Sequence, residues 1–421
     1  MEYLTPNFTK DMLKDYTVLV PNMCPIQFRL IKAALESEGY HRVELLGSGS
    51  SEVTQQGLKY VHNDTCYPAL IVIGQFLEAL NSGKYDLDHT ALIISQSGGG
   101  CRASNYIKLL RKALVRSGYG NIPVASANAN GLEPGSMMPM TKKLAMKLLA
   151  AVEYGDLIMA LRNETHAYAV DPEEPERMTE KWIMTVDRWI REDRHYLIPS
   201  FGKHFQQICE DFATIALDRV PKVKVGVVGE IYVKFSPTGN NHLVEFLESQ
   251  DCEVCLPGLM GYLEYCCANW AMDTEFYGIS PKMGRYAAAG LKVLNSIGIQ
   301  MSKALKEYGF YAPGSFYDLM EKPEGILSLG AKMGEGWLLT AEMVELIENG
   351  YVNIVCAQPF GCLPNHIAGK GVVNRIRQRY PEANITPVDY DPSATKVNQE
   401  NRIKLMLAVA RENLEKEGKT V

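Results

Sequence analysis

Apolar residues in the first third of the chain form short runs that alternate with longer amphipathic stretches. The run 17–21 precedes an amphipathic stretch over 25–39, and the order repeats with the run 43–46 and the stretch 51–61. Strands that alternate with helices predict a parallel sheet covered by helices on both faces. The alternation continues with expected helices over 68–82 and 103–117 and expected strands over 91–95 and 123–126.

The pattern changes near residue 140, where apolar residues recur at the three- and four-residue spacing of helices until about residue 220. A second set of strands is then expected over 223–229, 252–256, 353–356 and 384–388. We therefore predict an α/β fold with two flavodoxin-like or Rossmann-like parallel-sheet domains. They span residues 1–139 and 221–421, and a helical insert or bridge over 140–220 joins them.

Length and composition narrow the class of protein. The 421 residues exceed what one hydrophobic core usually covers. A net charge of −6 gives no basic surface of the kind that binds nucleic acid. No run of about eighteen apolar residues is present, and the first residues do not resemble a secretory signal. We expect a cytoplasmic protein that does not bind membranes and whose partners are proteins or small molecules.

Three of the ten cysteines share a position that suggests a common role. Cys66, Cys101 and Cys362 are each expected where a strand gives way to a polar or glycine-rich turn. Ligands of open α/β sheets bind beyond the carboxyl ends of the strands, where loops converge. Because two of these cysteines belong to the first domain and one to the second, we expect a site at the interface between the domains.

Thiolates brought together from distant loops are typical ligands of iron-sulfur clusters, whose potential depends on hydrogen bonds to sulfur and on exclusion of water. Glycines in the loop before Cys101 can direct backbone amides toward a sulfide or an anion. The predicted metal ligands are Cys66, Cys101 and Cys362, with Cys356 as a candidate fourth. The predicted cofactor-binding residues are Gly99, Gly100, Arg102 and Gln358.

Other interpretations of the cysteines stay open. Free cysteine is often a small buried hydrophobe, so an α/β protein without metal is one alternative. Zinc is another, but structural zinc usually takes closely spaced cysteine pairs, and here the three candidates are spread over about 300 residues (66 to 362). Cys24 is a weaker candidate ligand, and His366 a candidate acid or ligand. Cys252 and Cys255 are expected to be structural, and Cys266 and Cys267 to be buried in a helical core.

Four segments resemble a known family. They are NDTCYPALIVIGQ (63–75), QSGGGCRASNYI (96–107), GEIYVKFSP (229–237) and CAQPFGCLPNHIAGKG (356–371). They are similar to the C-terminal region of the large activator-related proteins of the 2-hydroxyacyl-CoA dehydratase superfamily, over nearly the whole chain. Double-cubane cluster proteins belong to the same group.

The resemblance implies an iron-sulfur component whose cluster lies between flavodoxin-like domains, with Cys66, Cys101 and Cys362 as ligands and Cys356 as a further candidate. It also implies a dimer and a partner that hydrolyses ATP, carries its own iron-sulfur cluster and delivers single electrons. The chain has no P-loop and no ATPase portion, so we expect that partner to be a separate protein. The substrate would be a small molecule or an acyl-CoA.

Two points about the cofactor remain alternatives. We expect one [4Fe-4S] cluster, and a double-cubane [8Fe-9S] cluster is the alternative because ten cysteines could supply the roughly six thiolates it needs. An incomplete set of thiolates would leave one iron open to substrate. A saturated cluster would instead favour an electron-transfer or scaffold protein without substrate chemistry of its own.

Overall fold

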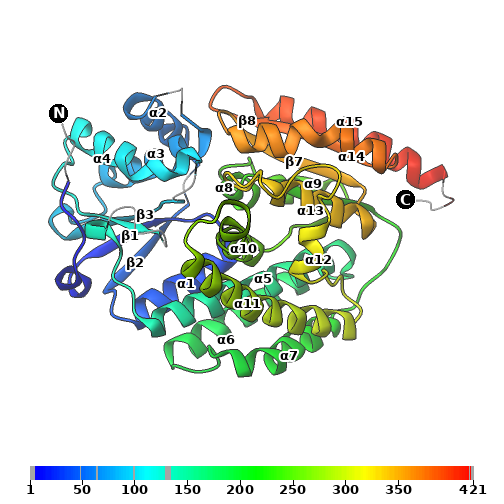
Figure 1. Ribbon diagram of the computed structural model, residues 1–421, viewed down its shortest axis with the longest axis horizontal. Coiled ribbons are helices and arrows are strands. Elements are labelled where there is room, and N and C mark those ends of the chain that lie inside the picture. Colours follow the sequence, from blue (N-terminus) through cyan, green and yellow to red (C-terminus); the bar gives the residue numbers. More distant parts are fainter. Residues whose placement is uncertain are drawn as a thin grey trace.

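The computed structural model describes residues 5–47, 49–62, 65–97, 100–128, 134–416 and 418. It contains two four-stranded sheets in which all strand pairs are parallel, each accompanied by helices (Figure 1). The strand orders are β2-β1-β3-β4 and β6-β5-β7-β8, so the two sheets share one topology. The predicted α/β class with two parallel-sheet domains is confirmed.

The first sheet follows the sequence prediction closely. Its strands are β1 (Thr17–Pro21), β2 (Arg42–Leu46), β3 (Thr90–Ser95) and β4 (Val124–Ala127). Its helices are α1 (Pro25–Ser37), α2 (Ser51–Tyr60), α3 (Tyr67–Asn81) and α4 (Tyr106–Ser117). Proline in the first turn of α1 and α3 suits a helix start, because those amides have no partner within the helix.

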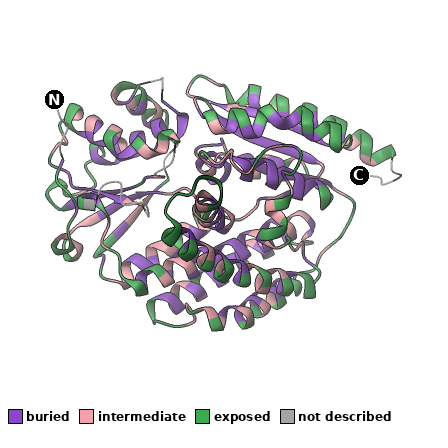
Figure 2. Ribbon diagram, in the orientation of Figure 1, coloured by how far each residue is buried: buried purple, intermediate pink, exposed green. Residues whose placement is uncertain are grey.

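The second sheet is formed by β5 (Val223–Gly229), β6 (Cys252–Cys255), β7 (Asn353–Pro359) and β8 (Asn384–Tyr390). Its shorter helices are α8 (Ile231–Phe235), α9 (Leu243–Ser249) and α14 (Val373–Arg379), and α15 (Lys396–Lys416) closes the chain. Every residue of β7 is buried, as expected for a central parallel strand covered on both faces. Figure 2 shows β5 and β7 largely in purple and the exposed faces of α14 and α15 in green.

Helices α5 (Lys142–Tyr168), α6 (Glu173–Arg191) and α7 (Phe201–Ala213) form the segment between the sheets. Helix α5 packs on α1 of the first domain and on β6 of the second. A second helical region separates β6 from β7, and the sequence predicted only one of its helices, the amphipathic helix around Cys266 and Cys267. The region contains α10 (Met260–Tyr277), α11 (Pro281–Glu307), α12 (Phe316–Glu321) and α13 (Trp337–Glu348). None of the described helices combines the length and apolar character needed to cross a bilayer.

Helix α3 joins the two domains. Its residues are buried on all sides from Tyr67 to Leu77, although a surface helix would keep a polar face. One continuous hydrophobic cluster runs from Leu92 of β3 through α3 to Val355 of β7. The Tyr232 hydroxyl of α8 donates to Gln75 Oε1 of α3 at 3.3 Å. The carboxyl ends of both sheets are therefore held at a common interface.

A buried ion pair holds the start of the second domain in place. Lys234 Nζ in α8 donates to both carboxylate oxygens of Glu342 in α13, at 2.8 and 3.1 Å. The two residues are only 4% and 6% exposed. Removing one member of such a pair leaves an uncompensated buried charge, which costs about 3–5 kcal/mol.

We therefore expect Lys234→Ala to lower the free energy of unfolding by about 3–5 kcal/mol in urea denaturation. The matched control is Lys181→Ala, because Lys181 pairs with Asp211 on the surface, where its side chain is 56% exposed. That control should change the free energy by less than about 1 kcal/mol. Equal effects of the two substitutions would contradict the structural role of the buried pair.

Candidate metal centre

The three predicted cysteine ligands lie on loops at the domain interface. Cys101 precedes a short 3-10 turn (Arg102–Asn105) after β3, and Cys362 follows the end of β7. Cys66 lies at the N-terminus of α3. The prediction that Cys66 directly follows a strand is wrong, because α2 intervenes between β2 and this loop.

Backbone contacts bring the loop of Cys362 against the loop of Cys66. The Tyr67 amide donates to the Phe360 carbonyl at 3.0 Å. A methyl group added to Gly361 would lie 3.2 Å from the Cα of Cys66 and 3.0 Å from the carbonyl oxygen of Thr65. The second domain thus closes directly over the N-terminus of α3.

The loop of Cys101 joins the same place through the segment before α13. A methyl group added to Gly334 would lie 2.8 Å from Cγ of Pro364 and 3.8 Å from Cβ of Cys101. The Gly100 amide donates to Sδ of Met333 at 3.2 Å. The segment of Met333 and Gly334 therefore contacts both the loop of Cys101 and the residues just after Cys362. The three cysteines thus converge on one site.

Two of the three thiols are buried, and Cys101 is partly exposed. Cys66 and Cys362 are each 5% exposed. Burial is the main cause that raises the pKa of all three, and it brings Cys101 to about 12. A smaller contribution comes from neighbouring thiols, since Cys66 raises the pKa of Cys101 and Cys101 that of Cys362. Such mutual effects require the sulfur atoms to lie in one neighbourhood.

The surroundings of Cys66 favour a bound anion. Its Sγ lies 2.8 Å from the hydroxyl oxygen of Tyr106, and either group can donate the hydrogen bond. The positive end of the fifteen-residue helix α3 also points at this loop, and helix N-termini favour thiolates and anions. A thiolate at Cys66 would therefore be stabilised by the phenol and by the helix.

The structure does not bring Cys356 together with the other three. It is fully buried in β7, on the sheet face where Ile354 packs against Met343 of α13. Its Sγ donates to Asn365 Oδ1 at 3.5 Å. The charged groups that affect its pKa are Asp389, Glu342 and Lys370, and none of the three thiols is among them. Cys24 is likewise buried, and its charged neighbours are Asp156 and Lys234.

The predicted cofactor-binding residues lie in different settings. Gly99 falls outside the described residues, and Gly100 contacts Met333 as described above. Arg102 is exposed, with a guanidinium nitrogen 3.2 Å from the place of a methyl group on Gly361. Gln358 is buried at the end of β7, where its Nε2 donates to Asp389 Oδ1 at 2.6 Å and lies 2.8 Å from Nε2 of His366. His366 Nδ1 lies 2.7 Å from the carbonyl oxygen of Cys362.

Two carboxyl groups beside the thiols were not predicted. Glu230 caps the N-terminus of α8 just after β5, and Glu335 lies just before α13. Burial, and the repulsion from Glu335, raise the pKa of Glu230, and burial also raises that of Glu335. Both carboxyls raise the pKa of Cys101 and Cys362. Glu230 could have been predicted at the site, because it directly follows a strand. No sequence pattern marked Glu335 in the same way.

One oxygen of Glu335 lacks a partner. Its Oε1 accepts a hydrogen bond from the Ile231 amide at 3.1 Å. Its Oε2 is buried without any hydrogen bond among the described residues. A buried polar atom without a hydrogen bond destabilises the fold unless another donor, such as a ligand, pairs with it.

A pocket of about 340 Å³ opens beside the thiols. Its wall includes Gly100, Tyr262, Cys266, Lys332 and Met333. Cys266 was expected in a hydrophobic core, and it does pack against the cluster around Trp337. The pitch of α10 also turns it to this pocket, which Cys267 does not line. The pocket therefore has a thiol of its own, on the wall that it shares with Gly100.

Within the described residues, no three histidine, cysteine, aspartate or glutamate side chains are grouped to hold a single metal ion. Neither a protein-family model nor a curated protein matches the chain.

Gly361 provides a test of this convergence. Its φ of +74° is strained for any residue with a Cβ, and the added methyl would press on Thr65 and Cys66. We expect Gly361→Ala to lower the free energy of unfolding by about 2–4 kcal/mol in urea denaturation. The control is Gly118→Ala, which has φ +91° but no atom within 4 Å of the new methyl and should cost only about 1–2 kcal/mol. Equal costs would show that the two loops do not touch.

Proposed function

We propose that the chain is the iron-sulfur component of an ATP-dependent, low-potential reductase of the 2-hydroxyacyl-CoA dehydratase type. It would accept single electrons from a separate ATP-hydrolysing activator and pass them to a small-molecule or acyl-CoA substrate. One observation carries the proposal: Cys66, Cys101 and Cys362, from loops of both domains, converge beside a pocket. The four sequence segments that resemble this superfamily include all three cysteines.

The residues present fit an iron-sulfur cluster. Cysteine thiolates are its usual ligands, and three are available from separate loops. When bound, such a cluster stores and releases single electrons at a potential set by its hydrogen bonds and its exposure to solvent. Tyr106 provides a hydroxyl at Cys66, and the buried setting of Cys362 excludes water. A protonated Glu335 would present an O–H donor at Oε2, the oxygen for which the described residues provide no partner.

The adjoining pocket suits the acceptor of the electrons. Its volume of about 340 Å³ lies at the lower end of the range for small-molecule sites. Tyr262, Tyr265 and Trp270 line it, and Asp273 and Lys332 form an ion pair there. The Tyr265 hydroxyl donates to the Lys332 carbonyl at 2.7 Å, which holds the loop of Met333 in place. A small molecule, or the acyl end of a thioester, would meet the thiols from this side.

A second function is favoured by the position of Cys266. If this thiol completes the ligand set, every iron of a [4Fe-4S] cluster is saturated and none can bind substrate. The chain would then transfer electrons or act as a scaffold without chemistry of its own. The number of protein thiolates on the cluster separates the two functions.

The ligand assignment predicts which cysteines retain iron. After anaerobic reconstitution, Cys66→Ala, Cys101→Ala and Cys362→Ala should each lose most of the bound iron and sulfide and the broad absorption near 400 nm that thiolate-bound iron gives. Cys209→Ala is the matched control, because Cys209 is fully buried in the helical layer around α7. It should keep full iron content. Full iron content in the first three variants would disprove the assignment.

Cys266→Ala and Cys356→Ala extend the same measurement to the fourth ligand. Loss of iron from Cys266→Ala supports a saturated cluster, and loss from Cys356→Ala would restore the ligand set expected from the sequence. If neither variant loses iron, one iron lacks a cysteine ligand. In that case the electron paramagnetic resonance spectrum of the reduced protein should shift when cyanide is added.

A further inference from the structure

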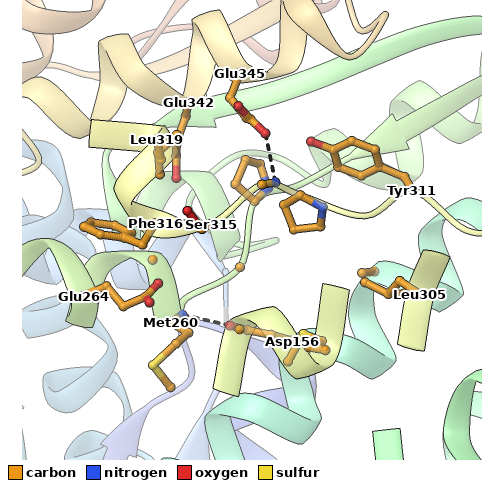
Figure 3. Close-up of a pocket in the computed structure, with 18 of the residues that line it drawn as sticks. Asp156, Met260, Glu264, Leu305, Tyr311, Ser315, Phe316, Leu319, Glu342 and Glu345 are labelled. Carbon is orange, nitrogen blue, oxygen red and sulfur yellow. Dashed lines mark hydrogen bonds between the residues drawn. The ribbon is translucent and has the colours of Figure 1, made fainter. Parts of the chain in front are cut away.

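A second pocket, separate from the three cysteines, lies among the helices around β6. It has a volume of about 190 Å³ and is lined by residues of α5, α10, α11, α12 and α13 (Figure 3). Much of its lining is apolar, including Met260, Met301, Leu305, Phe316 and Leu319. Pro313 and Gly314, also in the lining, are exposed to solvent and provide a way in.

Five carboxyl groups line this small apolar space: Glu153, Asp156, Glu264, Glu342 and Glu345. Figure 3 shows Asp156 and Glu264 on one side of the pocket, with Glu342 and Glu345 on the opposite side. The ion pairs of the described residues provide a cation for Glu342 (Lys234) and for Glu345 (Lys322). They provide none for the other three.

The three carboxyls without an ion pair differ in their hydrogen bonds. Asp156 accepts from the Met260 amide at 2.8 Å and from Gln27 Nε2 at 2.7 Å. Glu153 is only 1% exposed, and neither of its carboxyl oxygens has a hydrogen-bond partner among the described residues. Glu264 on α10 is 8% exposed and close enough to Glu153 to raise its pKa, after the larger effects of burial and Asp156.

An unpartnered carboxyl group in this position costs stability. A buried polar group without a hydrogen bond is destabilising, and an apolar side chain of similar size would fill the same place more favourably. A ligand that pairs with the carboxyl would remove that cost. The same residues form no group able to hold a single metal ion, which leaves an organic cation as the complementary partner.

We propose that this pocket binds a small aliphatic amine as its ammonium ion. The nitrogen would lie between Glu153 and Glu264, where a neutral amine would take up the proton that burial keeps on Glu264 and so form the ammonium-carboxylate pair. The hydrocarbon body would contact Met301, Leu305 and Phe316. The pocket volume suits a ligand with only a few carbon atoms. This inference does not depend on the iron-sulfur function.

Isothermal titration calorimetry with n-butylamine at pH 7 tests the proposal. The chain should bind the amine at least tenfold more tightly than 1-butanol, which has the same hydrocarbon body without the charge. Glu153→Gln and Glu264→Gln should each weaken amine binding at least tenfold. Glu275→Gln is the matched control, because Glu275 lies on the exposed surface of the same helix α10, and it should bind the amine like the unchanged chain.

Three results would overturn the proposal. They are no amine binding at millimolar concentration, equal binding of 1-butanol, and unchanged amine binding in Glu153→Gln. Both glutamine variants should remain folded, because each removes a carboxyl that is costly to bury. If Glu153→Gln fails to fold, the same comparison is made with Glu264→Gln.

The pH dependence of stability tests the acidic character of the same site. Burial, then Asp156, raises the pKa of Glu264 to about 8 from an ordinary value of 4.5. Glu153 and Asp156 face it from α5, and the paired groups Glu342 and Glu345 belong to α13. The folded chain therefore keeps a proton on Glu264 that the unfolded chain has lost, so this group destabilises the fold progressively as pH rises from about 4.5 to 8.

The Tm of Glu264→Gln, without ligand, should exceed that of the unchanged chain at pH 9 and approach it at pH 4.5. Thermal melts at the two pH values, with Glu275→Gln as the control, measure the difference. An offset of the same size at both pH values would show that Glu264 does not titrate in this range.

Discussion

The burial of α3 between the two domains is the constraint on which the rest of the structure depends. From Tyr67 to Leu77 this helix has no polar face to leave in water. It is therefore stable only while α2 and the first sheet, together with second-domain residues such as Tyr232, cover it. That requirement brings the loop of Cys362 over the start of α3, through the hydrogen bond between Tyr67 and Phe360. The convergence of the three thiols thus follows from hydrophobic packing at a distance from the sulfur atoms.

The interface concentrates groups that are costly to bury. Three thiols and two carboxyls lie near one another there, and Glu335 Oε2 has no hydrogen-bond partner among the described residues. Apolar side chains at these positions would make a more stable interface, because they require no desolvation of polar atoms. The buried ion pair of Lys234 and Glu342 lies near Glu335, and Glu342 raises the pKa of Glu335. These polar groups are surrounded by the buried apolar residues of the interface. Costly polar groups in such surroundings are typical of functional sites.

Much of the fold was predictable from local pattern. Strands such as β1 and β5 are short apolar runs, and both sheets formed where these runs alternate with amphipathic stretches. Of the helices between β6 and β7, only α10 was anticipated, around Cys266 and Cys267. Helix α13 was missed because it is buried almost throughout and does not show the one-sided pattern of a surface helix. Periodicity cannot separate such helices from irregular core segments.

The site was predictable only in part. The meeting of Cys66, Cys101 and Cys362 follows from a general rule about strand ends. The positions of Glu335 and Cys266 could not be inferred, since both depend on how α10 and α13 pack over the second sheet. Cys356 lies six residues before Cys362 in sequence, yet its strand directs it into the core beside Ile354. Proximity along the chain is a poor guide where a strand alternates its two faces.

Anomalous diffraction at the iron edge, from crystals grown anaerobically after reconstitution, tests the central claim most directly. The account predicts iron peaks within bonding distance of Sγ of residues 66, 101 and 362, at the interface of the two sheets. Iron bound elsewhere, or three free thiols at that interface, would contradict it.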